Sequence, residues 1–186
     1  MYWLTGYDTF GYVFFQSLVL DQKGNVILLT RAPDLRQAQN TSNIEDIRIW
    51  VDKDGINPTD DLKQILNELD LKGGNIGVEY EAYGMTGRNA LRLNKSLDNY
   101  CKVEDQSELI TKLRVIKSNE ELVYVRKAAE LADKALDEAW KHSKAGANEA
   151  KILAEMQKAV LEGGGDYPAN EYIIGSGSNA LLCRYQ

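Results

Sequence analysis

Two amphipathic helices, predicted one after the other between residues 118 and 165, constrain the fold of this chain more than any other feature. Ser118-Asn119-Glu120-Glu121 is a capping box: the serine hydroxyl accepts a backbone N–H while a glutamate carboxylate reaches back to the helix start. Behind it, apolar residues recur at helical spacing as far as Lys141. Asn148 begins a second helix, which three consecutive glycines at 163–165 end. The apolar face predicted for the first helix consists of Leu122, Val125, Ala129, Ala132, Leu136 and Ala139.

The residues after this helix pair predict a strand, a turn and a strand. Residues 171–175 and 180–183 are strand-like, and the small residues 176–179 join them. Two strands under two helices form a poor core by themselves. We therefore expect residues 105–186 to be a linker helix, near 107–113, and the first part of a larger α+β domain. We also expect the open edge and apolar faces near 171–185 to favour self-association, swapping or disorder.

The first 104 residues predict a separate mixed α/β domain. A hairpin is expected from strands at 12–20 and 26–30, followed by an irregular polar segment at 32–43 and a strand at 47–51. Asn57 and Pro58 suit the start of a helix, which ends before Gly73-Gly74. A short strand at 76–78, a helix capped by Thr86 and a strand at 100–103 complete the predicted domain.

Charge and cysteine content exclude several classes of function. The chain has 28 Asp and Glu against 22 Lys and Arg, a net charge of −6, and no basic block, which disfavours nucleic acid and anionic membrane as partners. Cys101 and Cys183 are the two cysteines, too few for a disulfide framework and without zinc-type spacing. No apolar run approaches the length of a membrane span. These features predict a cytoplasmic protein with reduced thiols.

Three segments, in order along the chain, carry a family resemblance. Residues 2–8 (YWLTGYD) resemble a segment of the N-terminal domains of creatinase, prolidase and aminopeptidase P. Residues 113–122 (LRVIKSNEEL), with 126–130 (RKAAE), resemble the entry to the "pita-bread" catalytic domain of the same superfamily. Residues 172–180 (YIIGSGSNA) resemble the strand and turn that line its active site.

The resemblance implies an α/β fold. A mixed-sheet, creatinase/prolidase-type N-terminal domain at 1–104 would precede a truncated α+β pita-bread domain at 105–186. The N-terminal domain would lack its first strand and helix. The resemblance also implies a homodimer and a peptide or small-molecule substrate.

The chemistry implied by the resemblance depends on metal. Such enzymes hold two divalent ions (Mn, Co, Fe or Zn) with two Asp, one His and two Glu, and a metal-bridging water attacks the substrate carbonyl. In the family those ligands lie beyond the segment that this chain matches. We therefore assign no catalytic residue and no metal ligand here, and expect this chain alone to bind no metal and to be inactive. The single histidine, His142, is expected at the surface of a helix C-terminus.

Substrate contacts are the remaining implication of the resemblance. Tyr7 and Asp8 are candidates for contact with a neighbouring subunit's substrate, although aromatic core packing is the simpler role for Tyr7. Asn179, Arg184 and Tyr185 belong to the turn and strand expected to line the active site.

Arg184 lies at or near the place where the peptidases tend to carry a histidine. Arginine cannot shuttle protons, but it can grip a carboxylate bidentately. This favours non-peptide relatives, such as ectoine hydrolases or metal-dependent dimethylsulfoniopropionate lyases, over plain Xaa-Pro cleavage. A solvent-facing arginine at a strand end is the plainer alternative, and a metal-free pita-bread binding module is the alternative to an enzyme.

Overall fold

The computed structural model describes residues 1–9 and 13–182 and divides the chain into two compact units, Met1–Arg114 and Val115–Gln186. The domain boundary expected after residue 104 stays a prediction. No helix within the described ranges is both long and apolar enough to span a bilayer.

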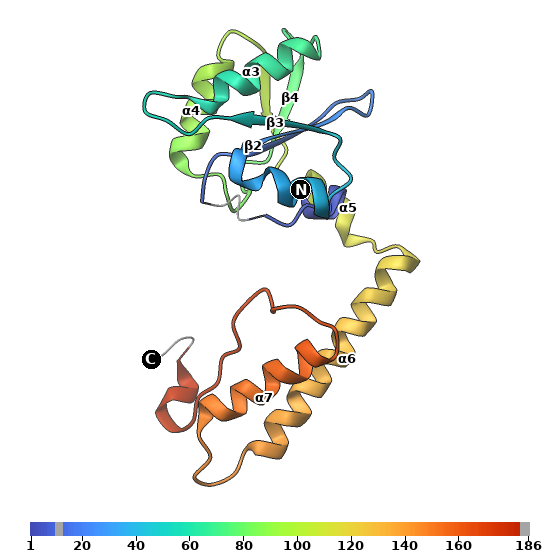
Figure 1. Ribbon diagram of the computed structural model, residues 1–186, viewed down its shortest axis with the longest axis vertical. Helices are drawn as coiled ribbons and strands as arrows, with labels where there is room; N and C mark the ends of the chain where they lie inside the picture. Colours follow the sequence, from blue (N-terminus) through green and yellow to red (C-terminus); the bar gives the residue numbers. More distant parts are fainter. Residues whose placement is uncertain (10–12, 183–186) are drawn as a thin grey trace. The chain divides into compact units, whose positions relative to one another are not determined.

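The first unit contains two small sheets. Strands β1 (Ser17–Leu20), β2 (Val26–Arg31) and β3 (Asp46–Trp50) form one sheet in that order, with β1 antiparallel and β3 parallel to β2. Strands β4 (Asn75–Val78) and β5 (Lys102–Asp105) pair in parallel, with Asn75 opposite Lys102. Helices α3 (Pro58–Glu68) and α4 (Gly87–Leu97) connect these strands (Figure 1).

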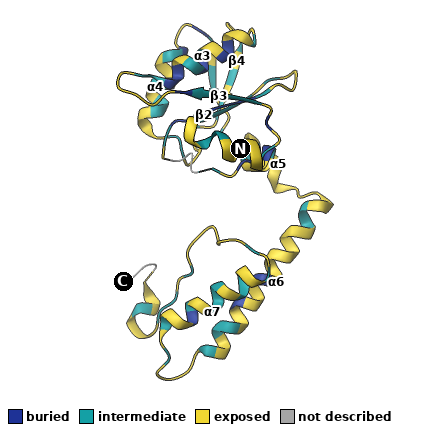
Figure 2. Cartoon of the chain, viewed as in Figure 1, coloured by how far each residue is buried: buried dark blue, intermediate teal, exposed yellow. Residues whose placement is uncertain are grey.

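Strand β2 organises the core because both of its faces are buried. Ile27 and Leu29 face a cluster that includes apolar residues of α3 and α4, whereas Leu28 faces a second cluster with Tyr7 and Ala38. This alternation follows the two-residue period of a strand. The unit is therefore built in layers, with helices against both faces of β2, and Figure 2 shows the buried residues concentrated there.

Two predictions for the first unit were wrong. Residues 32–41 are helical, not irregular: a 3-10 turn (Ala32–Asp34) leads into α2 (Leu35–Thr41). Pro33 is well placed in this first turn, and the fully buried Ala38 anchors the helix in the core. The strand predicted at 12–20 begins only at Ser17 among the residues described. The remaining helices of the unit are α1 (Tyr2–Thr5) and α5 (Leu109–Val115).

The second unit is a helix pair followed by an irregular segment. Helix α6 (Asn119–His142) starts at the predicted capping box, in which Ser118 and Glu121 exchange hydrogen bonds. Helix α7 (Glu149–Glu162) is capped by Asn148, whose side chain accepts from two backbone N–H groups, and it packs on α6 (Figure 1). Both helices confirm the sequence prediction.

The apolar face predicted for α6 is not the face that packs. Leu131 and Ala135 are the buried residues of α6, whereas Val125 and Leu136 of the predicted face are exposed. Helix α6 carries apolar residues on two faces, and α7 packs on the face that contains Leu131 and Ala135. Figure 2 shows α6 exposed over most of its surface.

The strand, turn and strand predicted at 171–183 are also not found in the part of the chain described. Residues 171–176 are irregular, and a 3-10 helix (Gly177–Leu181) takes up most of the predicted turn and the first two residues of the second predicted strand. A strand needs a hydrogen-bonding neighbour, and no other strand is described in this unit. Cys183 lies outside the described residues.

Candidate functional site

Tyr7 lies in the core of the first unit, where its ring is fully buried beside Leu28. Its hydroxyl accepts a hydrogen bond from Gln16 Nε2 at 3.1 Å, and the same amide donates to Thr30 Oγ1 at 2.6 Å. Thr9 Oγ1 donates to Gln16 Oε1 at 3.2 Å. Tyr7 therefore belongs to a satisfied polar network under the segment that precedes β1.

The backbone around Tyr7 is fastened to the end of α2. Gly6 has a φ of +78°, and a Cβ at this position would lie 2.9 Å from the carbonyl oxygen of Thr41. The adjacent Thr5 carbonyl accepts from the Asn43 N–H at 3.0 Å. Only glycine suits both the left-handed backbone and the close approach. The sequence Thr-Gly-Tyr-Asp thus fixes the direction in which Asp8 leaves the core.

Asp8 follows Tyr7 in the sequence and is exposed, whereas Tyr7 is buried. The backbone carbonyl of Asp8 accepts a hydrogen bond from the Gln37 side chain on α2, and its carboxylate forms no ion pair with any residue described. A carboxylate held beside a rigid backbone and open to solvent can receive a cationic or hydrogen-bond-donating group. Its role in substrate contact stays a prediction.

Asn179 lies in the second unit, half-buried within the 3-10 helix. Its N–H donates to the Ser176 carbonyl at 3.1 Å, and the Ser176 hydroxyl donates to Glu149 Oε1 at 2.5 Å, which ties the turn to the first residue of α7. A Cβ on Gly175 would lie 2.8 Å from the Asn179 carbonyl oxygen, so the turn requires glycine there. Arg184 and Tyr185 lie outside the described residues.

One group of possible metal ligands occurs among the residues described, on the facing sides of α6 and α7. Ligand atoms of Glu138, His142 and Glu155 lie within 4.8 Å of one another, and all three residues are half-buried. His142 Nε2 is 3.2 Å from Glu138 Oε2, which Lys141 Nζ also contacts at 3.1 Å. The Lys141 hydrogen bond, with the charges of Lys141 and His142, lowers the pKa of the Glu138 carboxyl.

This group does not fit a two-metal centre. A dinuclear site of the expected kind needs two Asp, one His and two Glu, and the group offers one imidazole and two carboxylates. Both carboxylates also have a lysine neighbour, since Lys158 lies 3.6 Å from Glu155. The sequence interpretation missed the cluster, although the i,i+4 spacing of Glu138 and His142 was a visible signal.

Cys101 is not suited to nucleophilic chemistry. It is half-buried, and burial raises the pKa of its thiol above the ordinary value. The neutral thiol is a poor nucleophile and a poor metal ligand. The described residues therefore supply binding surfaces and a scaffold, and no complete catalytic set.

Comparison with known proteins gives two family matches in order along the chain. Residues 1–116 match the family described as Creatinase/Prolidase N-terminal domain, and residues 123–186 match Metallopeptidase family M24. The ectoine hydrolase of Halomonas elongata is 26% identical over 97% of this chain and 49% of its own length. The Xaa-Pro dipeptidase of Pyrococcus furiosus is 32% identical over 47% of this chain and 25% of its own length.

Solved structures agree with these matches in fold. The X-Pro aminopeptidase of Thermotoga maritima superposes with a TM-score of 0.67 at 19% identity, over 87% of this chain and 42% of that chain. The dipeptidase of Pyrococcus horikoshii gives a TM-score of 0.64 at 24% identity, over the same shares. The predicted fold class is confirmed. The chain spans about half the length of the relatives that match most of it.

Proposed function

Because the chain belongs to the creatinase/prolidase superfamily, we propose that the whole protein is a hydrolase that uses two divalent metal ions. The observation that carries this proposal is the order of the two matches: an N-terminal domain at 1–116 is followed directly by peptidase sequence at 123–186. When bound, two such ions would activate a water for attack on an electrophilic carbon of the substrate, the carbonyl carbon of a dipeptide or the amidine carbon of ectoine.

The proposal assigns the metal ligands of the whole protein to sequence beyond residue 186. In support, the residues described offer one possible metal cluster, Glu138, His142 and Glu155, and its composition does not fit the dinuclear set. We accordingly propose that the 186-residue chain alone is inactive. The cytoplasm as location and a homodimer as assembly are further parts of the proposal.

For the substrate, we propose a small non-peptide molecule in preference to an Xaa-Pro dipeptide. The ectoine hydrolase of Halomonas elongata, a non-peptide relative, matches 97% of this chain in sequence at 26% identity. Arg184 supports the same choice through its chemistry, because a guanidinium grips a substrate carboxylate with two hydrogen bonds. Asp8, Asn179 and Tyr185 are the other proposed contacts, and Tyr7 would position Asp8 from the core.

The test is an assay of the complete gene product, loaded with Mn²⁺ or Co²⁺, on ectoine and on Xaa-Pro dipeptides in parallel. We expect hydrolysis of ectoine to exceed that of the dipeptides, and chelation to abolish it. Arg184→Lys should raise KM for ectoine by roughly tenfold, because lysine cannot make the bidentate contact. Arg126→Lys, on the exposed surface of α6, is the matched control and should leave KM unchanged.

Two outcomes would overturn the proposal. Faster hydrolysis of Xaa-Pro dipeptides than of ectoine would show a peptidase and remove the substrate assignment. A complete gene product that binds no metal and hydrolyses neither substrate would favour the metal-free binding module.

A further inference from the structure

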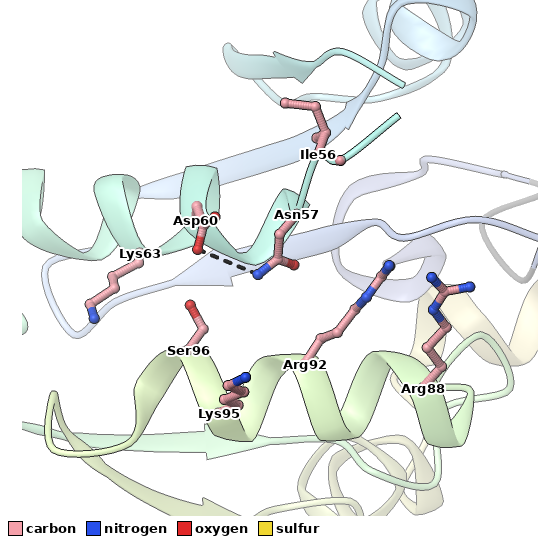
Figure 3. A pocket seen from close by; sticks show the side chains of 9 residues that line it. Ile56, Asn57, Asp60, Lys63, Arg88, Arg92, Lys95 and Ser96 are labelled. Carbon is pink, nitrogen blue, oxygen red and sulfur yellow. Dashed lines mark hydrogen bonds between the residues drawn. The ribbon is translucent and has the colours of Figure 1, made fainter. Parts of the chain in front are cut away.

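A groove between α3 and α4 in the first unit gathers basic side chains. It encloses about 580 Å³, and Figure 3 shows the two helices running side by side along it. We call it the α3–α4 groove and define it by the polar and charged residues that the argument uses: Asn57, Asp60, Lys63, Arg88, Arg92 and Lys95. Its size is in the range of pockets that hold small ligands, about 300–1,000 Å³.

The walls of the groove are fixed by the core beneath them. Leu62 and Ile65 of α3 and Leu93 and Leu97 of α4 are all buried in the same cluster. The Ser96 hydroxyl of α4 donates to the Thr59 carbonyl of α3 at 3.3 Å, which joins the two helices at one end. The two helices that form the walls of the groove are therefore held in place before a ligand binds.

Charge in the groove is strongly positive, although the whole chain carries −6. Arg88, Arg92 and Lys95 follow one another at i, i+4 and i+7 on α4. Lys63 of α3 also lines the groove, with its ammonium 4.9 Å from the centre of the Tyr100 ring. Asp60 is the one carboxylate of the lining, and the Asn57 amide donates to it at 3.4 Å. Within the described ranges, none of the four cations forms an ion pair with a carboxylate.

Such a row is destabilising unless an anion offsets it. Like charges at i,i+4 on a helix cost a few tenths of a kcal/mol per pair. The row spans about 10 Å along α4, at roughly 1.5 Å per residue. Two of its members are guanidinium groups, and Figure 3 shows Arg88 and Arg92 extending in the same direction from α4. The positive end of the α3 dipole, at Asn57, adds to the attraction for an anion.

We propose that the α3–α4 groove binds a small anion carrying two or more phosphoryl groups. Phosphate oxygens match the planar fork of arginine, and a diphosphate spreads its charge over several ångströms, as the row of cations does. A single carboxylate would leave most of this positive charge unpaired. The groove shares no residue with the proposed substrate contacts Asp8, Asn179, Arg184 and Tyr185, so the two proposals can fail separately.

The test is a titration of the 186-residue chain with pyrophosphate at low salt, followed by calorimetry and by amide chemical shifts. We expect one site per chain, weakened by added salt, with shift changes confined to α3, α4 and the loop before α3. Arg92→Gln should weaken binding about tenfold or more, the loss expected for a charged phosphate contact. Arg126→Gln, which removes the same charge from the exposed surface of α6, should leave the affinity unchanged.

Several results would overturn the proposal. The first is the absence of pyrophosphate binding by the folded wild-type chain. The second is an equal loss of affinity in Arg92→Gln and Arg126→Gln, which would show non-specific charge attraction. The third is equally tight binding of a monocarboxylate such as acetate. If Arg92→Gln fails to fold, Lys95→Gln at an exposed position replaces it with the same expected direction.

Discussion

At the scale of single residues, removing the hydroxyl of Tyr7 tests whether this residue stabilises the fold. The hydroxyl accepts one of the two N–H groups of the Gln16 amide, and the other goes to Thr30. Tyr7→Phe leaves one partly buried N–H donor of Gln16 without its acceptor. We expect a loss of about 1 kcal/mol in the free energy of unfolding, measured in urea. Tyr2→Phe, at an exposed ring, is the control. Equal stability of both variants would contradict the network.

Asp46 carries a second prediction at this scale, on the dependence of stability on pH. Its carboxylate receives two hydrogen bonds from Arg48, which also reaches Glu68 at 3.2 Å. The Arg48 contact lowers the pKa of Asp46 below its ordinary value of about 3.9. Because the pKa of Asp46 is lower in the folded state than in the unfolded state, the ion pair stabilises the fold fully when the pH is above the ordinary pKa. This stabilisation is lost as the pH falls through the lowered pKa of the folded state.

Asp46→Asn should therefore make unfolding less sensitive to acid between about pH 5 and pH 2. The loss of stability at pH 7 should be below about 1 kcal/mol, because the ion pair is partly exposed. Thermal unfolding across this pH range measures both effects. Asp54→Asn, at an exposed aspartate without an ion pair to a described residue, provides the comparison. If the stability of Asp46→Asn fell with acid as steeply as that of the wild-type chain, the proposed effect of the Asp46 pKa on stability would be wrong.

At the scale of secondary-structure elements, the sequence predicts best what local chemistry decides. Asn57, Thr86, Ser118 and Asn148 all cap helices as expected, because a cap is a contact between residues two or three positions apart. The face that α6 buries depends on the partner helix, and both of its apolar faces look alike in sequence. Residues 171–183 have strand-like composition, but pairing depends on a neighbour that composition does not reveal.

At this scale, the substitution Gly163→Ala separates helix propensity from packing. Propensity predicts that alanine raises the free energy of unfolding, whereas packing predicts that it lowers it. Gly163 ends α7 with a φ of −76°, so alanine is compatible with the backbone. A Cβ there would lie 2.2 Å from Leu131 Cδ2 and 3.1 Å from the Ala159 carbonyl oxygen. We expect Gly163→Ala to destabilise the second unit by about 1–3 kcal/mol through overpacking.

Gly87 is the matched control for Gly163. It is the first residue of α4, and a Cβ there would meet nothing within 4 Å. Gly87→Ala should therefore stabilise the first unit by about 0.4–1 kcal/mol. Chemical denaturation of both variants measures whether the free energy of unfolding rises or falls. Stabilisation by Gly163→Ala would show that Leu131 does not pack against the glycine.

At the scale of the whole molecule, the second unit leaves large apolar side chains exposed along one stripe of α6. Val125, Leu136 and Trp140 recur at helical spacing and are 50%, 54% and 74% exposed. Contiguous apolar surface of this kind promotes association. We expect the molar mass of the 186-residue chain, measured by light scattering, to rise with concentration, and Trp140→Glu to reduce the rise.

Leu91→Glu is the control for this prediction, since Leu91 is equally exposed but lies in the first unit. A wild-type chain that stays monomeric over the whole concentration range would contradict the prediction. So would an equal effect of both substitutions, because charge alone would then explain the change.

The candidate site was less predictable than the fold, for reasons visible at single positions. Core packing was the simpler expectation for Tyr7 and its burial confirms it, whereas the hydrogen bonds of its hydroxyl and the exposure of Asp8 could be found only from the fold. The α3–α4 groove combines cations separated by 32 positions, Lys63 and Lys95, which no local pattern joins. A groove between two helices depends on how the helices pack, and this packing is decided by residues that are far apart in sequence.

We propose that the whole protein is a two-metal hydrolase and that its metal ligands are encoded outside the 186 residues of this chain. Metal content tests it most directly, by mass spectrometry of the 186-residue chain and of the complete gene product after equal exposure to Mn²⁺ and removal of excess ion. We expect two ions per molecule of the complete product and no tightly held ion on the 186-residue chain. Two ions retained by the 186-residue chain, or none by the complete product, would contradict it.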